Sequence, residues 1–274
     1  MLFRSKKFSA TWPADVHLVG KDILRFHAVI WPAMLMAAGV AIPKKVFAHG
    51  WLLVGGEKMS KSKLTGIAPS DITDHFGVDA FRYYFLRAIP FGSDGSFSWE
   101  DMSARYTSEL ANDFGNLASR LAAMIEKYCD GKVPAVARDA ALAEALASTV
   151  ATADAAMVAL DFQGGINAAM DFCKRVNGYV TEKEPWILAK DPANKQVLEE
   201  VLYNTAESIR ALAVLLHPVM PHTTEILWES LGVTSTLGEI GAQKISNVAQ
   251  WGQLPEGATI TKTPVLFPRL ETKA

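Results

Sequence analysis

The first 56 residues show two short apolar runs separated by a helical pattern. Residues 16–20 form a brief strand-like run that ends in glycine, and residues 46–54 form a second run followed by a glycine pair. Between them, apolar residues recur at helical spacing over 23–35, with Pro32 where it can kink or divide the helix. Strand, helix and strand in this order predict one βαβ unit of a parallel sheet.

The pattern between residues 57 and 98 is less regular. It opens with a polar, basic loop and continues with a helix start for which Ser70 or Asp71 supplies the N-cap. Residues 79–86 predict a second helical piece. Residues 90–96 predict a loop, because proline, glycine and serine are frequent there.

From residue 98 onward, apolar positions recur at steps of three and four over long stretches, as in amphipathic helices. The predicted helices cover about 99–128, 142 to a stop at Gly164 and Gly165, 166–181, 195–216, and 223–231 with Gly232 as its cap. We expect Pro218 and Pro221 to end the fourth helix and the tail after Trp251 to be extended. Together these helices predict an antiparallel bundle.

Composition narrows the class of protein. Hydrophobic residues make up 50% of the 274 positions and charged residues 20%, which supports a sizeable core and excludes a disordered chain. The net charge is −2, so a nucleic-acid contact would depend on local basic groups. Cys129 and Cys173 form no C-x-x-C pair, which predicts neither a zinc knuckle nor a disulfide framework and favours a reducing cytoplasm.

Membrane attachment is not expected from the sequence. No run reaches the about 18 consecutive apolar residues that a membrane span needs. The basic N-terminal segment also lacks the apolar region of a signal peptide.

A loop rich in hydrogen-bond donors follows the second predicted strand. Residues 58–63 contain three lysines and two serines. Ammonium, hydroxyl and backbone N–H donors suit phosphate oxygens whose negative charge grows as a bond to phosphorus breaks. A generic Lys-x-x-Lys loop is more often an ordinary solvated loop, so the complete five-residue string at 58–62 is what favours a function.

Aromatic residues gather on the first predicted helix. Phe26, His27 and Trp31 lie close together, and the last two share a helix face at i and i+4. A thioether is soft and apolar and packs well against such rings. Asp22, near the strand end, is placed to anchor a substrate amino group. The alternative is a plain amphipathic core helix whose histidine is satisfied internally.

A polar stripe marks the first bundle helix. Asn112, Asn116 and Arg120 recur every four residues and therefore share one face. Asparagine and arginine can bond base edges, and a tryptophan after a rigid proline, as in Pro185-Trp186, offers a stacking surface. Taken alone, such a stripe is more often a solvated face, and a lone tryptophan is more often core.

Four segments together resemble methionyl-tRNA synthetases, which are class I aminoacyl-tRNA synthetases. They are Lys-Met-Ser-Lys-Ser at 58–62, the G-K-D-I-x-x-F-H-x-x-x-W-P-A pattern from Gly20 to Ala33, Asn-Leu-Ala-Ser-Arg at 116–120, and Pro185-Trp186. The likeness extends from about Trp12 to the end of the chain. A leucyl or cysteinyl enzyme of the same class would need a different pocket segment.

The resemblance implies catalytic roles for the matched residues. Lys58 and Lys61 would hold the β- and γ-phosphates of ATP, with Ser60 and Ser62 as supporting donors. The methionine site would contain Asp22, Phe26, His27 and Trp31. His49 and Gly50 would lie beside adenine together with Lys58 and Lys61.

It also implies an anticodon site and a reaction. Asn112, Asn116, Arg120, Pro185 and Trp186 would meet the CAU anticodon of tRNA(Met). The full enzyme would activate L-methionine with ATP and Mg²⁺ and then esterify the tRNA 3′ end, with no metal bound by this chain itself. The expected partners are tRNA(Met), ATP and L-methionine, in the cytoplasm and without a membrane.

The implied fold is the α/β remnant of a Rossmann-like catalytic domain followed by an all-α antiparallel helical bundle. The expected domains are residues 1–56, the carboxyl part of the catalytic domain; 57–98, the lysine loop and connecting region; 99–250, the anticodon-binding bundle; and 251–274, an extended tail.

One departure from the family concerns its amino-terminal half. No His-x-Gly-His string, which binds ATP in these enzymes, occurs in the sequence. Three interpretations stay open: a partial sequence, a truncated or split gene product whose missing half is a further partner, and a degenerate relative that only binds RNA as a catalytically incomplete module.

Overall fold

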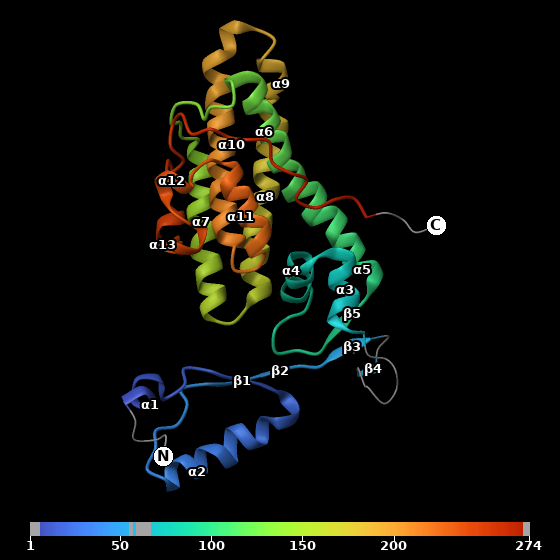
Figure 1. The fold of residues 1–274 in the computed structure, drawn as a ribbon, viewed down its shortest axis with the longest axis vertical. Helices are drawn as coiled ribbons and strands as arrows, with labels where there is room; N and C mark the ends of the chain where they lie inside the picture. The colour runs from blue at the N-terminus through green and yellow to red at the C-terminus, as the bar shows by residue number, and fades with distance from the viewer. Residues whose placement is uncertain (1–5, 55–56, 59–66, 271–274) are drawn as a thin grey trace. The chain divides into compact units, whose positions relative to one another are not determined.

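The computed structural model describes residues 6–54, 57–58 and 67–270 (Figure 1). Contacts within the chain divide it into two compact units. The first contains residues 1–66 and 89–98, and the second contains residues 67–88 and 99–274.

The first unit contains the predicted βαβ element. Strand β1 (His17–Gly20) pairs in parallel with β2 (Val46–His49), and His17 lies opposite Val46. The chain between them forms a 3₁₀ turn (Lys21–Ile23), a π-helical turn (Phe26–Ile30) and helix α2 (Trp31–Ala37). Pro32 occupies the first turn of α2, a position where its missing N–H costs no hydrogen bond, so it does not end the helix.

The second predicted strand is in fact two strands in different sheets. Strand β2 ends at His49, and β3 (Leu52–Val54) pairs antiparallel with β4 (Glu57–Lys58) and parallel with β5 (Gly95–Phe97). The prediction of a loop over residues 90–96 was wrong at its end, because Gly95 and Ser96 belong to β5. A strand of three residues is too short to reveal an alternating pattern. A short helix, α1 (Lys6–Thr11), completes the described part of this unit.

The second unit begins with α3 (Pro69–Phe76) and α4 (Val78–Ala88). The N-cap of α3 is Ala68, not Ser70 or Asp71. The Asp71 carboxylate instead reaches back and accepts a 2.9 Å hydrogen bond from the Ala68 N–H, which is one half of a capping box.

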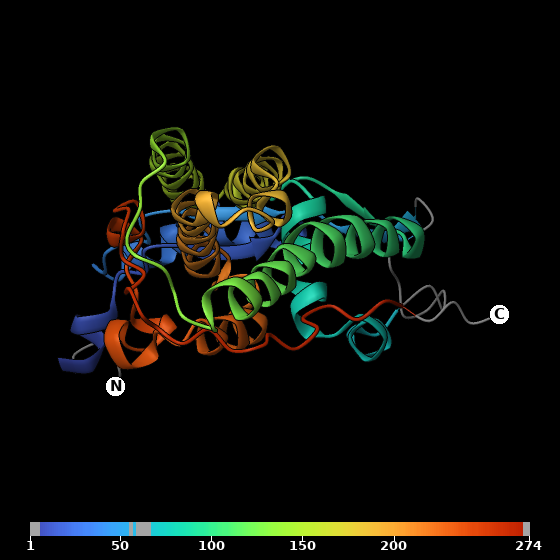
Figure 2. The same cartoon turned by 90° about the horizontal axis from the view of Figure 1, so that it is seen from above.

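One long helical path follows, as predicted. It consists of α5 (Trp99–Arg105), a π-helical stretch, η5 (Tyr106–Gly115), and α6 (Asn116–Cys129), with helical dihedral angles at both junctions. In Figure 1 this path slants across the upright helices of the bundle, and Figure 2 shows it obliquely while α7, α8 and α10 are seen nearly end-on.

The bundle is completed by α7 (Ala140–Val158), α8 (Phe162–Lys183), α10 (Lys195–Leu216) and α11 (Pro221–Ser230), with the short α9 (Pro185–Leu188) between α8 and α10. Small helical turns follow at α12 (Thr234–Leu237) and α13 (Ile245–Val248). Packing of α10 against α6, α7 and α8 makes it the central helix, and its residues 201–214 are all buried.

Two helix boundaries differ from the prediction. The chain reverses at Leu160, whose φ is +65°, and Gly164 and Gly165 lie inside α8 instead of ending α7. The Asp161 carboxylate caps α8 by accepting from the Gly164 N–H at 2.9 Å. Pro221 begins α11 and does not end α10, because proline suits the first helical turn.

Helix α7 is long and apolar enough to cross a membrane by length and composition alone. Its residues Leu142 and Leu146 are buried, and it packs against α8 and α10.

Both cysteines are free, as predicted, and burial raises the pKa of Cys173 to about 12 and that of Cys129 to about 11. Both thiols are therefore protonated and unreactive at neutral pH.

The described part of the tail after Trp251, residues 252–270, forms turns and irregular segments and is held by the bundle. The buried Glu207 carboxylate of α10 accepts hydrogen bonds from the backbone N–H groups of Gly252, Gln253 and Leu254 at 2.9–3.1 Å. Farther along, the Tyr106 hydroxyl donates to the Pro268 carbonyl at 2.8 Å. Both views show the tail running beside α6 (Figures 1 and 2).

Candidate functional site

An aromatic pocket lies in the first unit, beside the helical segment that follows β1. It has a volume of about 460 Å³ and is lined by Trp12, His17, Phe26, His27, Ile30, Trp31 and Met34. The three aromatic residues that the sequence assigned to a methionine site all line it. Trp12, His17, Ile30 and Met34 were not predicted, because two of them precede the helix and the other two look like ordinary apolar positions.

A π-helical turn brings the rings into one pocket. The Trp31 N–H bonds to the Phe26 carbonyl, so these two residues are one wide turn apart, at i and i+5. The expected pairing of His27 with Trp31 at i and i+4 assumed a regular α-helix. A π turn is not visible in an apolar pattern, and this is why the sequence predicted these residues on an idealised helix geometry.

Edge-to-face contacts hold the pocket walls. The ring centroids of Trp12 and Trp31 are 6.3 Å apart at 85°, and those of His17 and His27 are 6.1 Å apart at 84°. His27 Nδ1 lies 3.1 Å from the Ile23 carbonyl, which orients that ring. The pocket is therefore a firm, mostly apolar slot that suits an apolar side chain such as a thioether.

Asp22 lies outside this pocket, at the carboxyl end of β1. A Cβ placed on Gly20 would lie 2.5 Å from Asp22 Oδ1 and 3.9 Å from His49 Cε1. The exposed carboxylate of Asp22 thus folds over Gly20, and His49 lies beside it from the end of β2. Ligands of open α/β sheets bind outside the carboxyl ends of parallel strands, and these two side chains lie there.

The lysine loop begins at β4. The backbone of Lys58 pairs with Leu53 of β3, which fixes where the loop starts. Ser60, Lys61 and Ser62, which the sequence assigned to phosphate binding, lie outside the described residues. His49 Nδ1 is 2.9 Å from the Gly50 carbonyl, so the ring lies along its own backbone.

The predicted anticodon residues lie in the second unit and come from two elements. Asn112 belongs to η5, and Asn116 and Arg120 belong to α6. The guanidinium carbon of Arg120 lies 5.5 Å from the centre of the Trp186 ring, in cation–π range. Two segments far apart in the sequence therefore meet in one cationic, aromatic surface.

The position of Trp186 is set by its neighbours. Glu184 adopts a left-handed conformation with φ of 46°, which ends α8 and turns the chain into α9. Pro185 is buried in the first turn of α9, whereas Trp186 keeps part of its ring exposed. A buried proline and a half-exposed ring make a rigid platform for stacking.

The two asparagines border a second hollow. It has a volume of about 290 Å³, and its lining includes Asn112, Asn116 and Ser119 on one side and residues 265–267 and 269 of the tail on the other. Arg269 contributes an exposed positive charge there. The sequence pattern missed Ser119 and Arg269, because nothing in it places the tail against α6.

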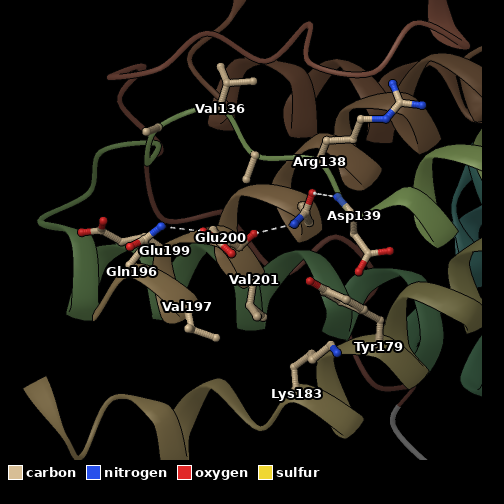
Figure 3. Close-up of a pocket in the computed structure, with 13 residues that line it drawn as sticks. Val136, Arg138, Asp139, Tyr179, Lys183, Gln196, Val197, Glu199, Glu200 and Val201 are labelled. Atoms are coloured by element: carbon tan, nitrogen blue, oxygen red, sulfur yellow. Dashed lines mark hydrogen bonds between the residues drawn. The ribbon is translucent and has the colours of Figure 1, made fainter. Parts of the chain in front are cut away.

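A third hollow is larger but carries none of the predicted residues. It has a volume of about 490 Å³ and lies between residues 135–139, the end of α8 and the start of α10 (Figure 3). Its central polar groups are already paired, since Asn204 accepts from the Asp139 N–H at 2.9 Å and donates to the Glu200 carbonyl at 2.8 Å. Among the residues that the structure describes, no group of three or more metal-ligating side chains is placed to hold a metal.

Comparisons with known proteins agree with both units. Residues 2–122 match the family model of tRNA synthetases class I (M), and residues 139–261 match the model of the anticodon-binding domain of tRNA ligase. The methionine–tRNA ligase of Streptomyces coelicolor is 62% identical over 98% of this chain and 51% of the relative. That of Halalkalibacterium halodurans is 44% identical over 98% of this chain and 41% of the relative.

Solved structures give the same result. The Mycobacterium tuberculosis methionyl-tRNA synthetase in complex with methionyl-adenylate aligns with a TM-score of 0.86 and 37% identity, over 97% of this chain and 52% of that one. Its free form aligns with a TM-score of 0.83 and 33% identity, over 98% of this chain and 52% of that one.

A small parallel α/β region followed by a helical anticodon-binding domain defines a class I aminoacyl-tRNA synthetase architecture. Within that class, the chain is a homologue of the methionine–tRNA ligases. It spans about half the length of the relatives that it matches.

Proposed function

We propose that the chain takes part in charging tRNA(Met) with L-methionine in the cytoplasm, with ATP and Mg²⁺ as the activating substrate. The aromatic pocket around Phe26, His27 and Trp31 is the single observation that carries this proposal. A pocket of this size, walled mainly by aromatic rings and with a mostly apolar surface, suits the thioether side chain of methionine.

The charged groups would act at the strand ends. Asp22 would hold the methionine ammonium group, and the backbone at His49 and Gly50 would lie beside adenine. Lys58 and Lys61, helped by Ser60 and Ser62, would stabilise the departing pyrophosphate as its charge develops. This chemistry is positioning and charge stabilisation, with no covalent intermediate on the protein.

The helical unit would read the anticodon. Trp186 would stack on a base, Arg120 would bind phosphate or a base edge, and Asn112 and Asn116 would bond base edges from the rim of the hollow beside the tail. Pro185 would keep the Trp186 platform rigid. Asn112 and Asn116 are exposed, and Arg120 and Trp186 are partly exposed, which supports this role.

Binding to two transcripts tests the anticodon assignment. Unmodified tRNA(Met) should bind the chain more tightly than the same transcript with its anticodon replaced. Equal affinities at one stated salt concentration would refute base reading, because non-specific phosphate binding alone gives no such preference.

A tRNA-binding module without catalysis is the second candidate. It needs only the second unit, in which Arg120 and Trp186 lie in contact. This candidate predicts anticodon-dependent tRNA binding with no methionine-dependent ATP–pyrophosphate exchange. Exchange by the chain alone, or only after addition of a polypeptide that carries the other half of a methionine–tRNA ligase, would decide between them.

A further inference from the structure

Lys21 follows β1 directly and makes an ion pair with Asp94, which lies just before β5. Lys21 Nζ is 2.5 Å and 2.6 Å from the two carboxylate oxygens of Asp94. It also lies 4.3 Å from the centre of the Trp51 ring. One ammonium group therefore touches two segments that are far from it in the sequence.

The same carboxylate holds the backbone at the start of β3. Asp94 Oδ1 accepts a 2.8 Å hydrogen bond from the Trp51 N–H, and the Trp51 carbonyl accepts a 2.9 Å bond from the Gly95 N–H. The peptide groups on either side of Trp51 are thus both bonded to residues 94–95. A Cβ on Gly50 would collide with the Ser93 carbonyl, so only glycine permits this close approach.

The clamped strand leads into the lysine loop. Strand β3 pairs with β5 on one side and with β4 on the other, and Leu53 lies opposite Lys58. Any shift at Trp51 would therefore move the strand on which the loop begins. Asp94 connects that strand to the carboxyl end of β1, where Asp22 lies next to Lys21.

We propose that Lys21 is a positioning residue that acts through Asp94 and Trp51 to fix the start of β3 and, with it, the origin of the lysine loop. This inference rests on the proposed function only in its last step, the effect on ATP chemistry. The clamp on β3 concerns only the first unit and is tested without any substrate.

Hydrogen exchange on the whole chain tests the clamp. In Lys21→Met, the amides of residues 51–54 and 95–97 should exchange about two- to fivefold faster, the range for losing one partly exposed ion pair. Lys21→Arg should restore the wild-type rates, because its guanidinium also pairs with a carboxylate. Asp94→Ala should accelerate exchange further, since it removes the Trp51 acceptor as well.

The first unit offers a matched control. Lys44 and Asp15 form an ion pair at 2.6 Å, with 66% and 82% of their side chains exposed, away from β3. Lys44→Met should leave exchange at 51–54 unchanged. If Lys21→Met behaves like Lys44→Met, the pair with Asp94 positions nothing and the proposal is overturned.

Kinetics test the last step separately. The assay is methionine-dependent ATP–pyrophosphate exchange, with the other half of a ligase supplied if exchange requires it. Lys21→Met should lower kcat/KM for ATP and leave the KM for methionine unchanged. Altered amide exchange with unaltered kinetics would keep the clamp and refute its role in catalysis. A wild-type chain without pyrophosphate exchange would refute the catalytic function and leave the amide-exchange test intact.

Discussion

The guanidinium group of Arg120 lies over the indole ring of Trp186, with 5.5 Å between the guanidinium carbon and the ring centre. Arg120 belongs to α6 and Trp186 to α9, so the contact joins two helices at the same end of the bundle (Figure 1). Both side chains keep solvent-accessible surface. The contact therefore holds the two side chains against each other at the surface of the second unit.

Replacing the ring should weaken tRNA binding and leave methionine activation intact. We expect Trp186→Ala to cost about 1–3 kcal/mol of tRNA binding, the range for losing one base–aromatic stack. The neighbouring Ile187→Ala, also on α9 and exposed, is the matched control and should bind normally. Filter binding of tRNA(Met) and pyrophosphate exchange measure the two properties, and an equal loss in both would show that Trp186 is structural.

The contact between Arg120 and Trp186 should also be measurable in the free protein. A double-mutant cycle with Arg120→Met and Trp186→Ala should give a coupling of about 0.5–1 kcal/mol in the free energy of unfolding, as for exposed cation–π pairs. Urea denaturation of the four proteins provides the values. Strictly additive effects would mean that the two side chains lie close together without interacting.

The aromatic pocket makes a prediction about methionine. Phe26 is 57% exposed, so Phe26→Ala should leave the stability of the first unit nearly unchanged. It should weaken methionine binding by about 0.3–1.5 kcal/mol through the lost sulfur–aromatic contact. Val29 is 61% exposed on the same π turn and does not line the pocket, so Val29→Ala is the control. Calorimetric titration with methionine compares the two variants. Identical affinities would show that Phe26 does not contribute to methionine binding.

Much of this architecture follows from the sequence, because long helices and one βαβ unit leave strong periodic signals. Helix α10 was predicted at its observed limits, since 22 residues of amphipathic pattern end at a proline-rich turn. The roles proposed for Phe26, His27 and Trp31 in the pocket, and for Arg120 and Trp186 in the second unit, came from a resemblance, not from periodicity. Their spatial convergence, as with Arg120 and Trp186, is a property of the folded chain.

The remaining features depend on interactions that are not local. Strand β5 is three residues long and exists because β3 lies beside it. The π turns at Phe26–Ile30 and Tyr106–Gly115 change which residues share a face without changing the apolar pattern. Gly164 and Gly165 looked like a helix end, but the cap from Asp161 and close packing against Met157 place them inside α8.

The ion pair between Lys21 and Asp94 should be visible in a titration. The Lys21 ammonium, and then the Trp51 N–H, hold the pKa of the Asp94 carboxyl below its ordinary value. A depressed carboxyl pKa stabilises the folded state above the pKa of the unfolded chain, and this contribution is lost as the pH falls through the folded pKa. Carboxyl ¹³C NMR should show Asp94 titrating below the ordinary range of an aspartate, and Lys21→Met should raise its pKa. An unchanged midpoint in that variant would contradict the pairing.

Glu207 should be the most sensitive site for the stability of the second unit. Its carboxylate is fully buried and is paired with Arg210, whose Nε and Nη2 atoms both donate at 2.8 Å. It also accepts three backbone N–H bonds from residues 252–254. Glu207→Ala would leave a buried guanidinium and three backbone N–H donors without this acceptor, which should cost about 3–5 kcal/mol in the free energy of unfolding.

A second glutamate on α10 separates this effect from a general loss of charge. Glu199 forms a 3.7 Å pair with Lys195 on the exposed surface, so Glu199→Ala should change the free energy of unfolding by less than about 0.5 kcal/mol. Because Glu207 accepts hydrogen bonds from all three backbone N–H groups at 252–254, its replacement should also expose the tail to proteolysis near Trp251, and that of Glu199 should not. Urea denaturation and limited digestion of the two variants test both effects. Equal stability losses, or an intact tail in Glu207→Ala, would show that the tail is fastened mainly by other contacts, such as the bond from the Tyr203 hydroxyl to the Leu254 carbonyl.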